Sequence, residues 1–251
     1  MNSEERKQKT LELLNRDGSI KVAALSKLFN TSEVTIRNDL ADMEYKGLLT
    51  RVHGGAVSSY KPYYSMNLNQ RLTTNYEEKL IIADKIAGMI ENNDTVMFNA
   101  GTTPLIVFRA LPQTLSLNIV TNSIAIALEA AEIPNFNIVL LGGETNSKYQ
   151  FTFGTDACAQ LKKYHADKLV LSVDGIDMKT GFSTYYDKEA ELDRIMLEQA
   201  DTRIVAADYS KFNRSAFAKI ADIDLADYIV TNRNVSGKLT KDIKKKNVVI
   251  V

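Results

Sequence analysis

Several residue types that often define a protein's chemistry are scarce in this chain of 251 residues. One cysteine excludes an internal disulfide, and Cys158 lies in an alanine-rich stretch typical of a small core residue. Lys and Arg number 31, as do Asp and Glu, so neither sign of charge dominates. No apolar run can cross a bilayer, and no signal pattern opens the sequence. We therefore expect a cytoplasmic protein with no membrane partner, metal or cofactor.

The hydrophobic pattern divides the chain into two parts. Residues 1–57 show short helical periods and a hairpin signal, and residues 58–75 show no sustained period. Residues 76–251 alternate between strand-like and helix-like patterns. A chain of this length accommodates one small and one medium domain. We predict a first domain, a linker and a second domain with these boundaries.

Short helices near the N-terminus have the spacing of a helix-turn-helix. After a first helix at Glu4–Asp17, a second spans Val22–Phe29 and stops before a tight turn. Ser32 or Thr31 then caps a third helix, which ends at Gly47. The apolar stripe of that helix consists of Ile36, Leu40 and Met43. Two helices joined by so tight a turn indicate a DNA-reading motif whose second helix enters the major groove.

The outer face of this third helix carries mostly short side chains, which allow close approach to DNA. Asn38 can make two hydrogen bonds to a base edge, Val34 can touch a thymine methyl, and Arg37 can reach guanine or phosphate. Alternating residues before a Gly-Gly pair predict a hairpin wing that places Arg51 and His53 along the backbone or in the minor groove. The predicted DNA-contacting residues are Ser32, Val34, Thr35, Arg37, Asn38, Arg51 and His53.

The charge of this first domain is balanced for a DNA-binding domain. Residues 1–56 hold nine Lys/Arg and eight Asp/Glu, whereas a basic footprint is typical of such domains. We therefore expect Asp39, Asp42 and Glu44 to lie away from the phosphates or to pair with neighbouring cations. Asp39 is interpreted as a structural partner. A helical subdomain without DNA-binding activity is the alternative interpretation.

The second part of the chain predicts an α/β fold. Short apolar strands are predicted at Thr95–Phe98, Leu117–Val120, Asn137–Leu141, Lys168–Val173, Arg203–Ala207, Tyr228–Val230 and Val248–Val251. Helices are predicted near residues 103–111, 123–131, 155–163, 187–200 and 236–246. This alternation indicates a doubly wound, largely parallel sheet. Such sheets bind ligands beyond the carboxyl ends of their strands.

Polar or glycine-rich residues follow most of these strands. The Gly-Thr-Thr segment at 101–103 leads into a helix, where backbone N–H groups and two hydroxyls form an anion site to which Lys211 adds a charge. Asp174, Asp177 and Glu189 are acceptors suited to sugar hydroxyls, although turn and helix-terminal roles explain such residues equally well. The pattern favours a phosphorylated polyol. The predicted effector-binding residues are Gly101, Thr102, Thr103, Thr121, Asn122, Gly142, Gly143, Asp174, Asp177, Glu189 and Lys211.

Several of these segments resemble the DeoR family of bacterial transcriptional repressors. The resemblance rests on residues 35–40 and the wing at 51–56, together with Gly101-Thr102-Thr103, Val120-Thr121-Asn122-Ser123, Gly142-Gly143 and Asp208-Tyr209-Ser210-Lys211-Phe212. It covers essentially the whole chain. Within the family, residues 35–41 and 210–215 are most similar to repressors of N-acetylgalactosamine utilisation. Two residues depart from the family pattern, because Asn38 stands where Arg is frequent and Asn99 where Asp is frequent.

The resemblance implies both an architecture and a function. It implies a winged helix-turn-helix joined to a sensor domain of the ribose-5-phosphate-isomerase-like type. It also implies a homo-dimer or tetramer that binds double-stranded operator DNA, represses a sugar or amino-sugar catabolic operon and is released by a sugar phosphate. On this basis we expect a regulator and not an enzyme.

Two other functions fit the sequence less well. A sugar-phosphate isomerase carrying a DNA-binding arm needs a general base, for which Asp174, Glu189 and Asp208 are candidates, with Lys211 stabilising an enediolate. Against it, a sensor gains by releasing its ligand unchanged. A nucleotide-dependent switch is disfavoured, because the chain has neither a Gly-x-x-x-x-Gly-Lys-Ser/Thr loop nor the glycine spacing of a dinucleotide site.

Overall fold

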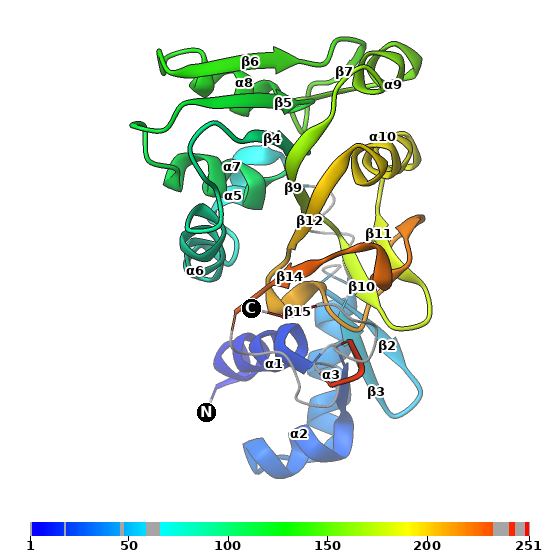
Figure 1. The fold of residues 1–251 in the computed structure, drawn as a ribbon. Helices are drawn as coiled ribbons and strands as arrows, with labels where there is room; N and C mark the ends of the chain where they lie inside the picture. Colours follow the sequence, from blue (N-terminus) through cyan, green and yellow to red (C-terminus); the bar gives the residue numbers. More distant parts are fainter. Residues whose placement is uncertain are drawn as a thin grey trace. The chain divides into compact units, whose positions relative to one another are not determined.

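The computed structural model describes residues 2–17, 19–45, 48–58, 66–232, 241–243 and 249–250. The chain forms two compact units, Met1–Met66 and Asn67–Val251, which we describe separately (Figure 1). The predicted linker at 58–75 straddles this division. The predicted helix end at Gly47, most of the predicted helix at 236–246, and both ends of the predicted strand at 248–251 lie outside the described residues.

The first unit is a winged helix-turn-helix. Its elements are α1 (Ser3–Asp17), β1 (Ser19–Lys21), α2 (Val22–Phe29), α3 (Glu33–Tyr45), β2 (Leu49–Val52) and β3 (Gly55–Ser58). The turn between α2 and α3 is held at both ends, because Ser26 Oγ donates to the Thr31 carbonyl at 2.6 Å and Thr31 N donates to the Ser26 carbonyl at 3.1 Å. Asn30 adopts the left-handed conformation that this turn requires, with φ 49°.

The core of this unit confirms the predicted apolar stripe of α3. Ile36, Leu40 and Met43 are buried together with residues of α1, α2 and the small sheet. The strands pair antiparallel in the order β1-β3-β2, and β1 is too short to produce a recognisable period in the sequence. It passes so close to the wing that a Cβ on Gly55 would lie 2.0 Å from the Ile20 carbonyl oxygen. Glycine at that position is therefore a requirement of tertiary packing.

The second unit is built around a parallel sheet. Its strands are β4 (Thr95–Phe98), β5 (Leu117–Thr121), β6 (Phe136–Leu140), β9 (Ala166–Ser172), β12 (Ala200–Ala206), β14 (Tyr228–Val230) and β15 (Val249–Ile250). Among the described residues their order is β15-β14-β12-β9-β4-β5-β6, and every neighbouring pair is parallel. The helices are α5 (Leu68–Thr73), α6 (Tyr76–Ala87), α7 (Thr102–Ala110), α8 (Ile124–Ala130), α9 (Thr155–Leu161) and α10 (Asp187–Glu198).

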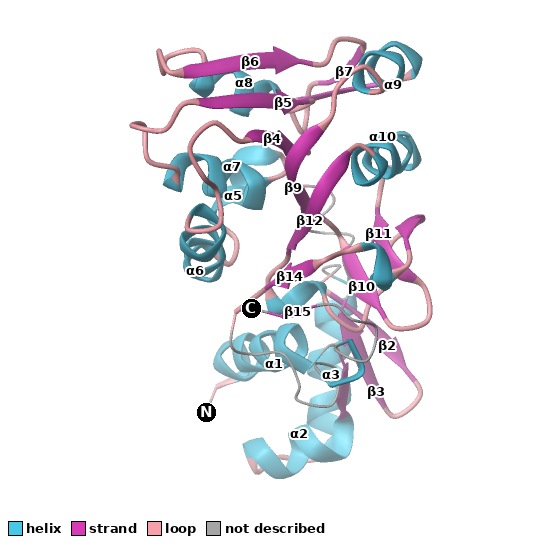
Figure 2. Ribbon diagram, in the orientation of Figure 1, coloured by secondary structure: helices cyan, strands magenta, loops and turns pink. Residues whose placement is uncertain are grey.

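Helices cover both faces of this sheet (Figure 2). Alternate residues of one strand enter different apolar clusters: Val96 and Phe98 pack with α6, α7 and α8, whereas Met97 packs with α9 and α10. The doubly wound, parallel arrangement predicted from the sequence is thereby confirmed. From β4 the chain first builds outward through β5 and β6, and then continues from β9 on the other side of β4. The strand order thus reverses between β4 and β9, where sheets of this kind bind ligands.

Smaller elements of the second unit were not predicted. They are the β7 (Glu144–Asn146) and β8 (Phe151–Phe153) hairpin, the antiparallel sheet of β10 (Gly175–Asp177), β11 (Gly181–Thr184) and β13 (Ala218–Ala221), and the short 3-10 helices η1 (Tyr209–Lys211) and η2 (Ile223–Leu225). Strands of three or four residues are too short to show a period of two. Helix α5 lies within the predicted linker and begins with a capping box between Asn67 and Gln70. None of the described helices has the length and apolarity needed to cross a bilayer.

Candidate functional sites

Helix α3 presents a polar, solvent-exposed face. Ser32 is confirmed as its N-cap, because Ser32 Oγ accepts a hydrogen bond from Thr35 N at 3.1 Å and lies 2.9 Å from Thr35 Oγ1. Val34 is 63% exposed, and the Asn38 side chain also faces solvent. An apolar side chain so exposed, next to an exposed amide, suits contact with base edges.

A hollow of about 360 Å³ lies between α3 and the wing. Arg37, Arg51 and His53 line it together with the backbone of Gly54 and Gly55. Arg37 Nη2 lies 2.5 Å from Glu33 Oε2, and Arg51 Nε lies 2.7 Å from Glu44 Oε2. The fold therefore brings three predicted DNA-contacting side chains to one place, each guanidinium held by a carboxylate.

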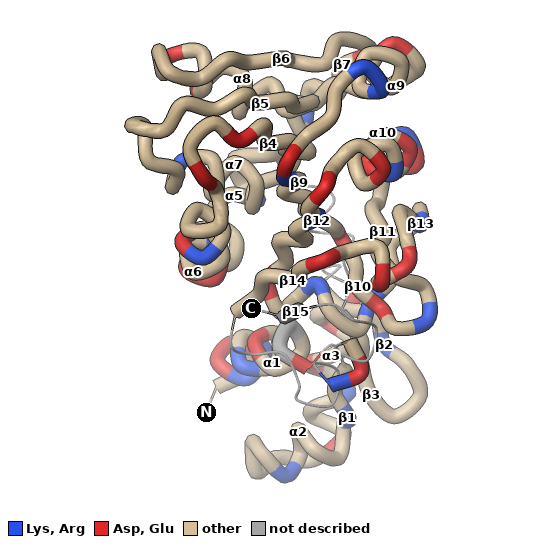
Figure 3. Tube along the Cα trace, in the orientation of Figure 1, with Lys and Arg blue, Asp and Glu red and all other residues tan. Residues whose placement is uncertain are grey.

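The acidic residues of α3 are paired within the unit, as expected. Asp39 accepts hydrogen bonds from Ser3 Oγ at 2.9 Å and Arg6 Nε at 2.8 Å, and Asp42 pairs with Lys7. Asp39 is thus confirmed as a structural partner. Glu44 accepts from the backbone N–H of Arg51 at 2.8 Å, and this bond lowers the pKa of the Glu44 carboxyl. Residues of both signs of charge lie along α1 (Figure 3).

In the second unit, the reversal of strand order brings the ends of β4 and β9 together. Gly101 follows β4 and lies against the end of β9, where an added Cβ would lie 2.2 Å from Ser172 Oγ. Asn99 Oδ1 accepts from Ser172 N at 2.8 Å, and Asn99 Nδ2 donates to Asp193 Oδ1 at 3.1 Å. A carboxylate in place of Asn99 would face Asp193, whose pKa is already raised by burial and by Glu189. Asn99, which directly follows β4, therefore links β9 and α10 through its side-chain hydrogen bonds.

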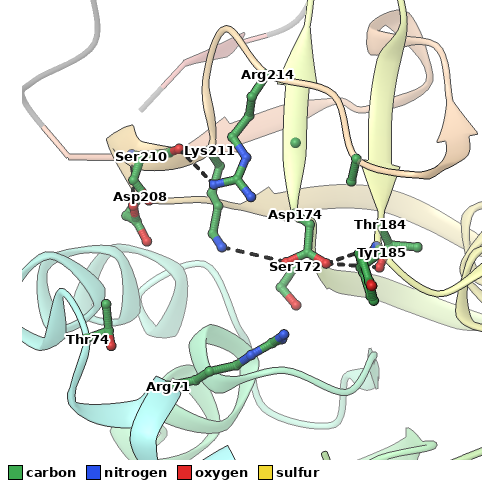
Figure 4. A network of polar contacts seen from close by, with 12 residues as sticks. Arg71, Thr74, Ser172, Asp174, Thr184, Tyr185, Asp208, Ser210, Lys211 and Arg214 are labelled. Atoms are coloured by element: carbon green, nitrogen blue, oxygen red, sulfur yellow. Dashed lines mark hydrogen bonds and ion pairs between the residues drawn. The ribbon is translucent and has the colours of Figure 1, made fainter. Parts of the chain in front are cut away.

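A polar cluster follows β9 at this edge (Figure 4). Lys211 Nζ lies 3.7 Å from Asp174 Oδ1, and Asp174 Oδ2 accepts from Tyr185 N at 3.0 Å. Thr184 Oγ1 bridges the two acidic residues, 3.3 Å from Asp174 Oδ2 and 2.8 Å from Glu189 Oε2. The structure thus joins Asp174, Glu189 and Lys211, three predicted effector-binding residues from separate parts of the chain.

The pKa values of the two carboxyls of this cluster are shifted in opposite directions. Burial opposes the ionisation of Asp174, but the Lys211, Arg71 and Arg214 cations outweigh it and lower its pKa. Burial and the Asp174 charge raise the pKa of Glu189 to about 7. Asp174 is therefore a charged acceptor at neutral pH, whereas Glu189 can either accept or donate a hydrogen bond.

Basic residues that the sequence analysis missed complete the cluster. Arg71 comes from α5, and Lys79 from α6 donates to the carbonyls of Arg71 and Thr74, each at 2.6 Å. Lys79 is only 2% exposed, and burial lowers its pKa to about 8. A signal was present in the sequence, because Lys79 shares the buried helical stripe of Ile82, Ala83 and Ile86.

Four of the remaining predicted effector-binding residues are buried at the start of α7 or at the end of β5. Thr102 and Thr103 are buried at the start of α7, and Thr121 Oγ1 donates to the Phe98 carbonyl at 2.8 Å. Asn122 Nδ2 donates to the Thr152 carbonyl at 3.1 Å. Asn122 Oδ1 is buried without a hydrogen-bond partner among the described residues, so it offers an acceptor to a ligand.

Three predicted residues shape loops. Gly142 N donates to Gln160 Oε1 at 3.0 Å, and Gly143 adopts φ 130°, which favours glycine. Asp177 Oδ1 accepts from Lys179 N at 2.9 Å and from Thr180 N at 3.1 Å within the β10–β11 turn. The bonds of Gly142 and Asp177 and the backbone conformation of Gly143 give these residues a structural role, and their part in ligand binding stays a prediction.

Comparison with protein-family models decides the identity of both units. A model of the DeoR C terminal sensor domain matches residues 74–233, which is more than half of the chain. A model of the DeoR-like helix-turn-helix domain matches residues 6–61. The chain belongs to the DeoR family. This DeoR-family protein is accordingly a DNA-binding transcription regulator and not an enzyme.

Similar proteins support this membership over almost the full length. The chain is 32% identical over 249 residues to a putative aga operon transcriptional repressor of Escherichia coli O157:H7, which covers 98% of this chain and 93% of that protein. It is 31% identical to the glycerol-3-phosphate regulon repressor of Escherichia coli strain K12, with 92% of each chain covered. Among solved structures, ribose 5-phosphate isomerase A from Methanocaldococcus jannaschii matches with a TM-score of 0.40 and 16% identity over 55% of each chain.

Proposed function

We propose that this DeoR-family protein represses a sugar-catabolic operon in the cytoplasm, and that a phosphorylated sugar releases it from operator DNA. The proposed ligand binds at the β4–β9 edge of the second unit. The observation that carries the proposal is the convergence of Lys211, Arg71 and Arg214 on Asp174 beside the Gly101 loop. Relatives whose names refer to the aga operon and to glycerol 3-phosphate point to the same ligand class.

The start of α7 is the proposed phosphate site. Gly101 has no side chain with which to cap the helix, so the first backbone N–H groups of α7 can bind an anion. Thr102 and Thr103 supply hydroxyls there, and Gly101 allows the close approach of this loop to Ser172. Basic side chains on the facing loop provide the balancing charge.

Asp174 and Glu189 are the proposed recognition groups for the sugar. The ionised Asp174 accepts hydrogen bonds from hydroxyls, and the protonated form of Glu189 donates one. Either carboxylate also suits the ammonium group of an amino sugar. We propose an amino-sugar phosphate as the effector because residues 210–215 resemble those of the N-acetylgalactosamine repressors and because of the aga relative.

The proposed mechanism is thermodynamic linkage. Two wings of a homo-dimer or tetramer bind two half-sites of an operator, and the ligand binds better to a conformation in which these wings are misplaced. A coupling free energy of about 1–3 kcal/mol changes operator affinity by about 5- to 150-fold.

A pair of threonine variants tests the phosphate site. Thr102→Val and Thr103→Val remove the hydroxyls at the start of α7, and Lys211→Ala removes the facing cation. Thr155→Val is the matched control, because Thr155 is the exposed first residue of α9. We expect all four variants to bind operator DNA as the wild type does, and only Thr155→Val to retain release by sugar phosphates in an electrophoretic mobility assay. Normal release of the first three variants would disprove this placement.

The ligand class is tested with a thermal-shift screen of hexose, pentose and amino-sugar phosphates against their unphosphorylated sugars. Binding at a hundredfold excess over the dissociation constant stabilises the folded state by about 2.7 kcal/mol. We expect stabilisation by at least one phosphate and none by its parent sugar. Equal stabilisation by both would refute a phosphate-dependent effector.

A further inference from the structure

Strand β6 forms one edge of the parallel sheet (Figure 1). Among the described residues it pairs only with β5, and its register with β5 is regular over all five residues. Edge strands expose backbone N–H and C=O groups, which proteins usually protect with lysine, proline or a β-bulge. The β6 sequence, Phe-Asn-Ile-Val-Leu, contains none of these. By comparison, the edge strand β13 carries Lys219. The edge of β6 is therefore suited to pairing with another strand.

The hydrogen bonds to β5 show which backbone groups of β6 face outward. Leu141, which directly follows β6, donates through its N–H to the Thr121 carbonyl of β5 at 2.8 Å. Alternate residues of a parallel strand direct their N–H and C=O groups to opposite sides, so the odd-numbered residues of β6 bond β5. The N–H and C=O groups of Ile138 and Leu140 accordingly point away from the sheet.

The side of this edge that faces α8 is apolar. Phe136 is buried in the same cluster as Ile126 of α8, and Ile138 packs against that cluster. Leu140 lies two residues further along the strand and so shares this face, where its side chain is 42% exposed. Leu128 of α8 is 71% exposed. Aliphatic surface thus accompanies the outward backbone groups.

The charge of this region favours a second copy of the chain as the partner. A quarter of the whole sequence is charged, whereas residues 110–143 contain only Glu129 and Glu132. Both carboxylate oxygens of Glu129 bind Arg109, at 2.9 Å and 2.6 Å. A two-fold contact between identical surfaces brings like charges close together, which is unfavourable, so a nearly uncharged edge suits self-association. A nucleic acid would require a basic surface instead.

We propose that β6 pairs antiparallel with β6 of a second copy of this chain, so that the two sheets join into one. The two-fold axis passes beside Ile138, whose N–H and C=O groups bond those of the same residue in the second copy. The proposal rests on the homo-dimer or tetramer of the proposed function and names an interface for it. The joined copies carry two DNA-binding units, one for each half-site.

Sedimentation equilibrium of the full-length protein tests this interface. Leu140→Lys places a charge at the edge, and Leu140→Pro removes an outward N–H in a position that an edge strand tolerates. Ile81→Lys is the matched control, because Ile81 is 47% exposed on α6, and Lys85 of that helix bonds the Thr231 carbonyl near the opposite edge of the sheet. We expect both Leu140 variants to weaken self-association by about tenfold or more, and the control to match the wild type.

Oxidative cross-linking tests the register without a disruptive substitution. The Cα atoms of a hydrogen-bonded antiparallel pair lie about 5.5 Å apart, which is within the span of a disulfide. We expect Ile138→Cys to form a covalent dimer on a non-reducing gel. The wild type, whose Cys158 is buried, and Ile81→Cys should not cross-link.

The outcomes separate this interface from the proposed function. If Leu140 variants fold and keep the wild-type mass, or if an oligomeric Ile138→Cys protein does not cross-link, the β6 interface is wrong, and an oligomeric, effector-released repressor remains in place. If the wild type is a monomer at every concentration, both with and without operator, this inference and the oligomeric mechanism of the proposed function fail together.

Discussion

Single side chains set the chemistry of both units, and on α3 the exposed Asn38 is best suited to read a base. Asn38→Ala is expected to weaken binding to the cognate operator by about 1–3 kcal/mol, because a bidentate contact to a base edge is lost. Arg37→Ala is expected to cost a similar amount if that guanidinium leaves Glu33 for guanine. Fluorescence anisotropy with operator and scrambled duplexes measures both effects.

Gln8→Ala provides the control for the α3 variants, because Gln8 is an exposed residue of α1. A base-reading role requires that the loss for Asn38→Ala be larger on the operator than on the scrambled duplex. Unchanged operator affinity in both the Asn38 and Arg37 variants would remove these residues from the reading surface.

Glu189 makes the stability of the second unit depend on pH. Its pKa is raised from 4.5 to about 7 by burial and by Asp174, with Asp193, Thr184 and Arg71 also acting on it. Between these values the unfolded chain ionises while the folded protein stays protonated. The Glu189 contribution to stability is therefore present below pH 4.5, is lost as the pH rises through about 7, and is constant above that.

A comparison of the wild type with Glu189→Gln checks the direction of this pH dependence. Urea unfolding between pH 4 and pH 8.5 should show the free energy of unfolding of the wild type falling relative to the variant by about 1–3 kcal/mol. A difference that is independent of pH, or that favours the wild type at high pH, would contradict the raised pKa.

At the scale of elements, one carboxylate links the wing directly to α3. Glu44, near the end of α3, bonds both the backbone N–H and the Nε of Arg51 in β2. Glu44→Ala is expected to weaken operator binding by about 1 kcal/mol, or roughly fivefold, because Arg51 loses its fixed direction. Glu12→Ala on α1 is the control, and binding is compared by anisotropy and by hydroxyl-radical footprinting of the wing contact.

The footprint separates this role from a simple charge effect. Removal of an acidic residue by itself raises affinity for any DNA, since it increases the net positive charge. Tighter binding of Glu44→Ala with an unchanged footprint would therefore show that Glu44 does not position the wing.

Elements that consist of a buried apolar run or an apolar helical stripe were predicted well, whereas short strands that depend on pairing with distant segments were not. Strands β4 and β14 and helix α2 were predicted with the bounds that they have in the structure. Strand β1 and the β10-β11-β13 sheet consist of three- and four-residue strands, which are stabilised by partners distant in the sequence and carry no period of their own. Helix α5 was missed because its six residues are polar on most sides.

At the scale of the whole molecule, the sensor and the DNA-reading unit must be coupled reciprocally. If a sugar phosphate lowers operator affinity by a given factor, operator DNA must lower sugar-phosphate affinity by the same factor. We expect that factor to lie between about 5 and 150. Calorimetric titration of the effector into the protein with and without saturating operator measures it. Equal effector affinities in both titrations would contradict linkage as the mechanism of release.

The sequence by itself determined the winged helix-turn-helix, the alternation of the α/β unit and the family, because local periods, caps and glycine-rich loops encode them. Only the tertiary structure decided which side chains meet. Arg71, Asp174 and Lys211 lie far apart in the chain. They converge because Asp174 follows β9, Lys211 follows the neighbouring parallel strand β12, and Arg71 extends toward both from α5. Lys79 is buried because it packs against the carboxyl end of α5, where it donates to the Arg71 and Thr74 carbonyls. Such convergence depends on long-range packing, which no local pattern encodes.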